Sequence, residues 1–415
     1  MKEFELANAL LNDILLNDVT FKKALKTAFP KNSHDRVYLS KVSALVGCEL
    51  RHHSLFLNLS HSLNENITNE EKNLVFLAMA NIYFLKKHDN VEVIKYVKSV
   101  LGDKYDESVK KLLTHEGVIG DLVDIDKNSL KYFAIRFNTP EWLVKMWIKH
   151  FGRTLTLKTL KANNYPAKVE VRVDENKVNV SNDPNFEKSE VENVYYYKNK
   201  DAYRKLPGFT FGDIFPLKGV VKALIDEYAD PFAQEFSIYS GNDDSLVKEL
   251  NILSKGEKGI NVVVPELSKR PELLRYVRTK KLKNINLFEA NDEVGFQVGL
   301  SRKQDFLLLN PLSSSFDKIR KYPDYMLHFK KDDFDAFIKN QKMLIESLSK
   351  FVEEDGTFIY IVDTINKKES FGVVTSFLLA HPEFSLINER QIFPFEKEDT
   401  AIYFAVMKLN RQKND

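Results

Sequence analysis

The chain has 415 residues, which at roughly 150 residues per domain predicts two to three domains. Its composition (43% hydrophobic, 29% charged, 15 Gly and 13 Pro) is typical of a folded globular protein and excludes disordered and collagen-like classes. The 61 basic and 59 acidic residues nearly cancel, so any nucleic-acid surface must come from local segregation of charge.

The number of cysteines and the N-terminal segment indicate the cellular compartment in which the protein works. The chain has one cysteine, Cys48, which excludes an internal disulfide and a zinc or iron–sulfur site built from cysteines. Adjacent His52 and His53 would project about 100° apart on a helix, so we expect no metal there. Residues 1–18 mix acids with apolar residues and do not read as a secretory signal, and no stretch is apolar enough for a membrane helix. We therefore expect a cytoplasmic protein in a reducing compartment.

Apolar residues recur at helical spacing from Phe4 to about Leu130. This pattern predicts an all-helical domain over residues 1–130. The segment 74–85 is apolar nearly all round, which indicates a helix buried inside the bundle. Cys48 falls among these helical residues, and we expect it to be buried there.

The pattern changes after Asn128, where Thr139-Pro140-Glu141 is a helix-start signal. Beyond Pro166, alternating apolar and polar residues predict three short strands. They lie at residues 169–173, 178–180 and 194–197. The sequence therefore predicts a small α/β domain over residues 131–215.

The C-terminal part, residues 216–412, alternates between segments with helical spacing and short apolar runs typical of strands. The predicted helices are 220–228, 245–253, 271–281 and 334–351, and the predicted strands are 236–239, 261–264, 285–288, 306–309 and 358–362. Strands separated by helices predict a parallel, doubly wound sheet with helices on both faces, in a multidomain chain. The ligand crevice of such a sheet lies at the carboxyl ends of its strands.

The segments at those strand ends are weakly informative. The first turn, residues 239–244, has one Gly and two carboxylates, which would repel a phosphate. Acids follow the next two strands, Glu266 and Asp292, and could bind a cofactor or be solvated loop acids. The serine run 313–315 comes with no catalytic His/Asp spacing, so a serine hydrolase is not supported.

Basic residues cluster in two places. The helical part has Arg36, Lys41, Arg51, His52 and His53, and the region around two tryptophans has Lys145, Lys149, Arg153, Lys158 and Lys161. Lys145 and Lys149 share one helix face. Either cluster is an ordinary solvated face or part of a groove for a nucleic-acid backbone.

A series of segments carries a resemblance to a known family. They are 35–37, 46–51, 140–144, 151–152, 171–174, 206–209, 320–324, 341–344, 356–360 and 381–384. In order and spacing the chain resembles the Sun/RsmB-type bacterial RNA cytosine-C5 methyltransferases. The resemblance implies a NusB-like helical RNA-binding domain, a small RNA-binding linker domain and a Rossmann-like domain that uses S-adenosylmethionine. It makes Arg36, Arg51, Lys145, Lys149 and Arg172 the candidate RNA-binding residues.

The chain departs from the family at the three motifs that carry chemistry. The Gly-rich donor turn is replaced by residues 239–244, with no Gly pair and no Lys. Ser313 occupies the position of one functional cysteine of the family, and Asp363 occupies the position of the cysteine that attacks the base. Glu266 and Asp292 match the family's ribose and adenine-edge acids, and Asn310 is polar at the next position. Methylation at C5 needs a soft nucleophile, and an aspartate is a poor one for that addition.

These departures favour a catalytically degenerate, RNA-binding member of the family with ribosomal RNA as partner, and S-adenosylmethionine or no cofactor at all. The alternative is an active S-adenosylmethionine-dependent ribosomal RNA methyltransferase with a rearranged site. A third hypothesis is a protein–protein adaptor that docks on an assembly factor, which predicts no salt-dependent RNA affinity.

Overall fold

The computed structural model describes residues 2–29, 36–198, 207–230, 233, 235–300 and 302–411, and only the backbone of Arg36 and Val37. Asp35 and Leu206 of the resembling segments, the side chain of Arg36, and the predicted domain end at 412 lie outside the described residues. The chain forms two compact units. One is Met1–Pro166 with Lys318–Phe329, and the other is Ala167–Asp317 with Lys330–Asp415.

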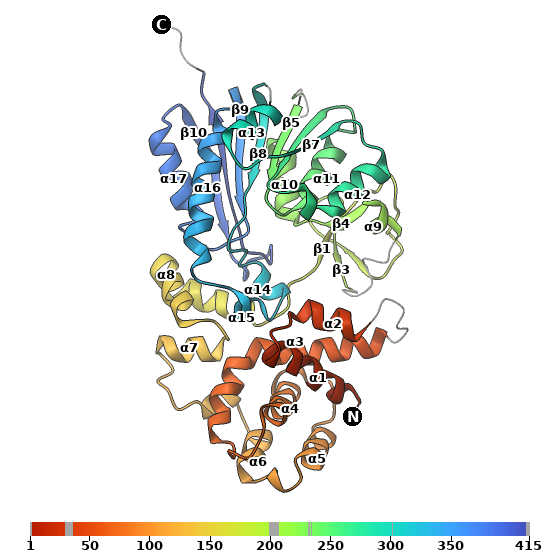
Figure 1. Cartoon of the computed structure of the whole chain (residues 1–415), viewed down its shortest axis with the longest axis vertical. Coiled ribbons are helices and arrows are strands. Elements are labelled where there is room, and N and C mark those ends of the chain that lie inside the picture. The colour runs from red at the N-terminus through yellow and green to blue at the C-terminus, as the bar shows by residue number, and fades with distance from the viewer. Residues whose placement is uncertain are drawn as a thin grey trace. The chain divides into compact units, whose positions relative to one another are not determined.

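The first unit is helical, as predicted (Figure 1). Its main helices are α1 (Lys2–Leu16), α2 (Phe21–Ala28), α3 (Arg36–Leu59), α4 (Asn69–Ala80), α5 (Asn90–Leu101), α6 (Glu107–Thr114), α7 (Leu130–Arg136) and α8 (Glu141–Asn163). A capping box begins α4, because the Thr68 side chain accepts from the Glu71 N–H while Glu71 accepts from the Thr68 N–H. Every residue of α4 from Asn73 to Ala80 is buried, and a π-helix, Asn81–Leu85, continues it. The predicted core helix is confirmed.

The helical unit extends beyond the boundary predicted at residue 130. The chain between α7 and α8 is fixed on α3, because the Asn138 side chain accepts from the Ser54 N–H at 3.0 Å and donates to the Leu50 carbonyl at 2.7 Å. Both helices therefore belong to the same compact unit as α1–α6, which ends at Pro166. Sequence periodicity locates helices but does not show which neighbours they pack against.

A segment distant in sequence completes this unit. Residues 318–329 contain two short helices, α14 (Lys318–Lys321) and α15 (Tyr325–His328). Arg51 of α3 donates to the Arg320 carbonyl at 3.1 Å, and the Phe21 N–H donates to the Asp324 carboxylate at 2.8 Å. Arg320 in turn donates to the Tyr165 carbonyl at 3.0 Å. These contacts explain why the segment groups with the helices and not with its chain neighbours.

The second unit contains a small antiparallel sheet with strand order β2-β3-β1-β4. Its elements are β1 (Glu170–Val173), β2 (Phe186–Lys188), β3 (Val194–Tyr197), the short helix α9 (Pro207–Phe211) and β4 (Ile214–Pro216). The strand predicted at 178–180 is wrong. The chain turns just before this segment, at residues 175–177, where the Lys177 and Val178 N–H groups both donate to the Asp174 carbonyl, and residues 178–180 pair with no strand. The valine alternation reflects burial of Val180 under this sheet, not strand pairing.

The larger sheet has seven strands in the order β10-β11-β9-β8-β5-β6-β7 (Figure 1). The strands are β5 (Glu235–Ser240), β6 (Gly259–Val264), β7 (Ile285–Glu289), β8 (Gln304–Asn310), β9 (Val352–Val362), β10 (Phe384–Ile392) and β11 (Ile402–Leu409). The five strands from β5 to β9 are parallel, as predicted. The sheet as a whole is mixed, because β11 runs antiparallel to both β9 and β10. No helix separates β10 from β11, and such a direct connection joins antiparallel strands.

Helices cover both faces of this sheet, which confirms the Rossmann-like fold class. The helices are α10 (Gly219–Tyr228), α11 (Asp244–Leu253), α12 (Pro271–Lys280), α13 (Glu293–Gly299), α16 (Asp333–Ser349) and α17 (Phe371–Ala380). Ile238 and Val262 pack toward α10–α12, while Tyr239 and Val263 pack toward α13, α16 and α17. No helix in the described part of the chain is long and apolar enough to cross a membrane.

His52 of α3 gives the helical unit a testable pH dependence. Its ring is 6% exposed and stacks on Phe84 with centroids 3.7 Å apart. Burial, with Arg136 and Arg51 nearby, lowers the pKa of His52 from 6.5 to about 3. A depressed histidine pKa gives stability that is complete above the unfolded pKa and is lost as the pH falls below it. Between pH 6.5 and about 4.5 this loss is about 2 kcal/mol, because the slope approaches ~1.4 kcal/mol per pH unit only once the pH is below the unfolded pKa.

We expect His52→Phe to remove this part of the acid destabilisation. The measurement is urea unfolding of the wild type and the variant at both pH values. Exposed His61, changed to Phe, is the matched control and should keep the wild-type pH dependence. Equal losses in wild type and His52→Phe would contradict the argument.

Candidate functional site

The crevice of the seven-stranded sheet lies where strand order reverses, between the carboxyl ends of β5 and β8. From β5 the chain adds β6 and β7 on one side, and then β8 and β9 on the other. The turn after β5 and the loop after β8 therefore meet at the position where doubly wound proteins bind ligands.

The turn after β5 is packed directly on the loop after β8. The Gly241 N–H donates to the Asn310 carbonyl at 2.7 Å. A Cβ at Gly241 would lie 2.7 Å from the Leu312 nitrogen and 2.8 Å from the Pro311 carbonyl carbon. Glycine is required here because the two backbones touch. This close approach leaves no side-chain volume between Gly241 and the loop after β8.

The beginning of α11 is occupied by the chain's own acids. The Asp243 carboxylate accepts from the Ser245 N–H at 2.9 Å, which caps the helix. Asp244 forms an ion pair with Arg270 at 2.9 Å, and the Arg270 side chain also donates to the Ser240 hydroxyl. Burial raises the pKa of Asp244, although Arg270 opposes the change. With its N-terminus capped by carboxylates, α11 is not a phosphate site, as the sequence predicted.

Glu266 and Asp292 follow β6 and β7, adjacent parallel strands, so they lie at the same edge of the sheet. Both already have partners. Glu266 pairs with Lys269 at 2.6 Å, which lowers the pKa of Glu266, and it accepts from the Ser268 hydroxyl. Asp292 caps α13 by accepting from the Gly295 N–H at 2.8 Å. Both carboxylates are accessible, and either could still accept from a hydroxyl.

Asn310, at the end of β8, is 3% exposed. Its amide nitrogen donates to the Ile361 carbonyl at 3.1 Å, while its side-chain oxygen has no partner among the described residues. A buried acceptor without a donor is costly and can mark a ligand position. Asn310, Glu266 and Asp292 therefore fit the hydroxyl and amino groups of an S-adenosyl donor, whereas the acids of the turn 239–244 would repel the carboxylate of its methionine part.

A buried carboxylate, Glu369, ties together the loops after β8 and β9. It accepts from the Ser314 N–H at 2.7 Å and the Ser314 hydroxyl at 2.6 Å. It also accepts from Thr364 at 3.3 Å, Asn366 at 3.0 Å and Gln341 at 3.2 Å. Glu369 is fully buried. Its role could not be predicted from the sequence, because an acid after Lys367-Lys368 is typical of a solvated turn.

The two positions at which the resembling family has cysteines, Ser313 and Asp363 in this chain, lie on these loops. Ser313 is 8% exposed, and its hydroxyl accepts from the Ser315 N–H at 3.2 Å. Asp363 is half-buried at the end of β9. The chain's one thiol, Cys48, lies in α3 of the other unit, where its Sγ donates to the Ala80 carbonyl and burial raises its pKa to about 12. No thiol serves the crevice.

Two of the predicted RNA-binding residues are structural. Arg172 of β1 is 5% exposed and pairs with buried Glu249 of α11 at 3.0 Å. Arg51 donates to the Gly47 and Arg320 carbonyls and so fixes the segment 318–329. Arg172 is therefore buried in an ion pair and Arg51 is bonded within the fold, which gives both residues a structural role. In the sequence, a buried arginine that pairs within the protein looks the same as an exposed one.

The basic residues of α8 are exposed, as expected both for an ordinary solvated face and for a surface that binds a nucleic-acid backbone. The exposed side chains are those of Lys145, Lys149, Arg153, Lys158 and Lys161. Lys145 and Lys149 form no ion pair with a described residue, whereas Arg153 donates to Asn128 and lies over the Phe133 ring. The helix is kinked at Gly152, where φ is 78°, so the basic residues before and after the kink do not share one continuous face.

Comparison with known proteins supports the family resemblance. The chain is 23% identical over 339 residues to a protein named "Probable ribosomal RNA small subunit methyltransferase B" of Bacillus subtilis (strain 168), covering 75% of this chain and 72% of the relative. No protein-family model matches the chain. The resemblance to the Sun/RsmB-type proteins is confirmed.

Solved structures support the fold over almost the whole chain. The crystal structure of PH0851 matches with a TM-score of 0.73 and 17% identity, covering 97% of this chain and 98% of that one. A methyltransferase homolog protein from Pyrococcus horikoshii matches with a TM-score of 0.56 and 15% identity, covering 68% of this chain and 99% of that one. At these identities the comparisons show a shared fold.

Proposed function

We propose that this chain is an RNA-binding member of the Sun/RsmB-type ribosomal RNA cytosine-C5 methyltransferases that has lost methyl transfer. The observation that carries the proposal is the crevice between β5 and β8. The crevice has no thiol. Glu369 fixes the loops after β8 and β9, which carry Ser313 and Asp363 at the two positions where the resembling family has cysteines. The scaffold around the crevice retains the Rossmann-like fold.

The chemistry explains why these replacements matter. In the resembling family a thiolate adds to C6 of cytosine and activates C5, and a second group assists release. Asp363 is a hard oxygen nucleophile, and Ser313 has no base among its hydrogen-bond partners. Neither side chain can take the role of a thiolate.

The second candidate is an active S-adenosylmethionine-dependent methyltransferase with a rearranged site. The unpartnered Asn310 oxygen favours it, because a bound donor would satisfy this acceptor. The test is calorimetric titration with S-adenosylmethionine and S-adenosylhomocysteine. Saturable binding that Asn310→Leu abolishes would support this candidate. Absence of binding would support the first proposal and show that the donor site has been lost together with methyl transfer.

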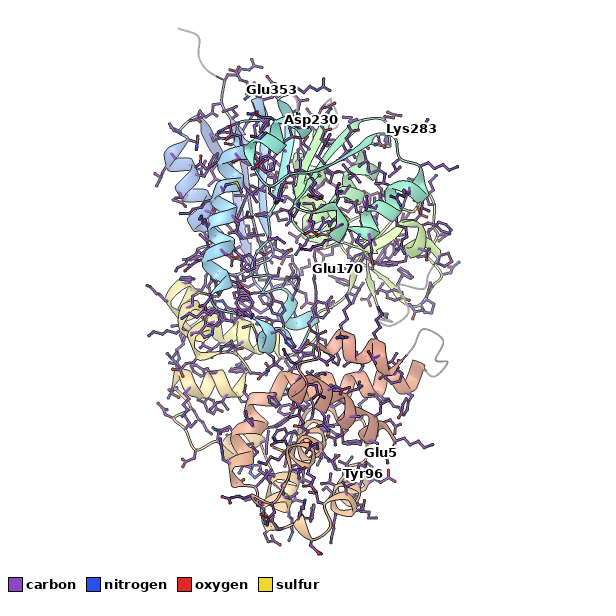
Figure 2. The ribbon with its side chains drawn as sticks, viewed as in Figure 1. Glu5, Tyr96, Glu170, Asp230, Lys283 and Glu353 are labelled. Atoms are coloured by element: carbon purple, nitrogen blue, oxygen red, sulfur yellow. The ribbon has the colours of Figure 1, made fainter. Side chains whose placement is uncertain are left out.

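We infer that RNA contacts the exposed lysines of the first half of α8. Replacing both Lys145 and Lys149 with Ala should weaken binding of ribosomal RNA fragments and reduce the slope of log K against log salt by about 1.4 to 1.8, or ~0.7–0.9 per phosphate contact. Filter binding over a salt series measures this. Lys283, an exposed lysine of the second unit labelled in Figure 2, is the control and its Ala variant should bind as the wild type does. An unchanged slope in the double variant would remove α8 from the RNA site.

The remaining parts of the proposal follow from the resemblance. The resemblance assigns a NusB-like role to the helical region over 1–130, an RNA-binding role to residues 131–215, which include parts of both compact units, and a methyltransferase-like role to residues 216–412. Arg36 stays a predicted RNA contact. The protein works in the cytoplasm, and an assembly factor is its further partner.

A further inference from the structure

The solvent-facing side of α2 in the helical unit is made of lysines. Lys22, Lys23 and Lys26 are exposed, and exposed Thr27 completes the same side. At about 100° per residue, the three lysines fall within one sector of about 100° around the helix axis. Ala24 is buried on the opposite side. α2 is therefore an amphipathic helix whose polar face carries positive charge and no acid.

The charge of this lysine face is not neutralised within the helical unit. Among the described residues, no carboxylate forms an ion pair with any of the three lysines. Two acids lie near the beginning of α2, and both have other partners. Asp324 accepts from the Phe21 N–H at 2.8 Å, and the Asp18 carboxylate lies 3.1 Å from Nδ1 of His328. The lysine face therefore presents three positive charges to solvent.

The three lysines do not stabilise the helix that carries them. Lys22 and Lys26 are four residues apart and Lys23 and Lys26 are three apart, spacings at which like charges on a helix repel each other. Lys22 and Lys23 also lie in the first turn, where the helix dipole disfavours cations. In the same unit α1, α4, α5 and α6 have acids in their first turn. A bound polyanion would relieve this repulsion, so the arrangement favours binding and not folding.

The packing of α2 restricts the kind of polyanion. A basic amphipathic helix that binds an anionic bilayer inserts its apolar face into the lipid. The apolar residues of α2, Phe21, Ala24 and Leu25 among them, already pack in the core of the bundle, so they cannot enter a membrane. A nucleic-acid backbone requires only exposed cations that can each meet a phosphate, and the lysine face provides three. RNA is therefore the partner that fits this face.

We propose that Lys22, Lys23 and Lys26 form a second phosphate-binding surface for ribosomal RNA, in addition to the lysines of α8. The inference rests on the proposed function, because it takes RNA as the ligand. Both helices belong to the same compact unit. Contacts to phosphates carry no sequence information, so α2 adds affinity and orients the RNA without selecting its bases.

The test is filter binding of ribosomal RNA fragments to the purified chain over a salt series. The α2 triple variant carries Lys22→Gln, Lys23→Gln and Lys26→Gln. It should bind more weakly and reduce the slope of log K against log salt by about 2.1 to 2.7, at ~0.7–0.9 per phosphate contact. Its unfolding midpoint should not fall, because the substitutions remove repulsion between lysines. Circular dichroism measures the midpoint.

Two matched variants separate the position of the charge from its amount. The control triple variant changes net charge equally at exposed lysines of the same unit, with Lys87→Gln, Lys95→Gln and Lys111→Gln, and should keep the wild-type slope. The variant with Lys22→Arg, Lys23→Arg and Lys26→Arg keeps the charge of α2 and should bind as the wild type does. Equal losses in the α2 and control triple variants would overturn the proposal, because RNA would then respond only to net charge.

The remaining outcomes distinguish this surface from the proposed function. An unchanged slope in the α2 triple variant, with a reduced slope in the Lys145 and Lys149 double variant, would overturn the proposal for α2 and leave RNA binding by α8. A wild-type chain without salt-dependent RNA binding would overturn both. Polyglutamate is the probe for an acidic protein partner. If the α2 triple variant loses affinity for polyglutamate but not for RNA, the lysine face binds acidic protein segments and the proposal is wrong.

Discussion

Replacing Glu369 with Ala should lower the free energy of unfolding of the second unit by about 3–5 kcal/mol, the cost typical of breaking a buried charged network. The carboxylate is the common acceptor for Ser314, Gln341, Thr364 and Asn366. Its removal leaves buried donors unsatisfied at several points, and each such group costs ~1–3 kcal/mol. The loops after β8 and β9 would then lose their connection to each other.

Urea unfolding followed by circular dichroism measures this change, and protease sensitivity near residues 312–315 and 363–370 reports the loops directly. Glu353, an exposed glutamate of β9 labelled in Figure 2, is the matched control. Its Ala variant should change stability by less than ~0.5 kcal/mol. A Glu369→Ala protein as stable as the control would show that the network is not structural.

Arg172→Ala should destabilise the second unit by a similar amount, about 3–5 kcal/mol. The substitution leaves Glu249, which is 2% exposed, without its ion-pair partner at 3.0 Å. Burial already raises the pKa of Glu249, against the opposing effect of Arg172, so the pKa of Glu249 should rise further in the variant.

The double variant Arg172→Met with Glu249→Leu distinguishes an ion pair from simple packing. Removing both charges together should restore most of the lost stability, because no unpaired charge stays buried. Chemical denaturation of the three variants gives the coupling. RNA affinity measured on folded Arg172→Ala should equal that of the wild type. A selective loss of RNA affinity without destabilisation would return Arg172 to the RNA-binding residues.

The sequence predicts the local elements well because their signals are local. Helical spacing identified the buried helix α4, and alternation of helices with apolar runs identified the parallel strands β5 to β9. The direction of β11 and the joining of residues 318–329 to the helical unit depend on contacts between distant segments. No periodicity encodes such contacts.

The site shows the same division. The turn 239–244 and the acids Glu266 and Asp292 could be placed at strand ends from the sequence. The burial of Arg172 could not be predicted, because its charge says nothing about Glu249, 77 positions away. Glu369 was missed because its partners come from two loops and a helix that meet only in the folded unit.

Methyl transfer is the most direct test of the central claim. The purified protein is incubated with tritium-labelled S-adenosylmethionine and small-subunit ribosomal RNA, with the Bacillus subtilis relative assayed in parallel on the same RNA. We expect salt-dependent RNA binding and no label in the RNA above a protein-free blank. Label at C5 of a cytosine, lost in the Asp363→Ala variant, would contradict it and establish an enzyme with a rearranged site.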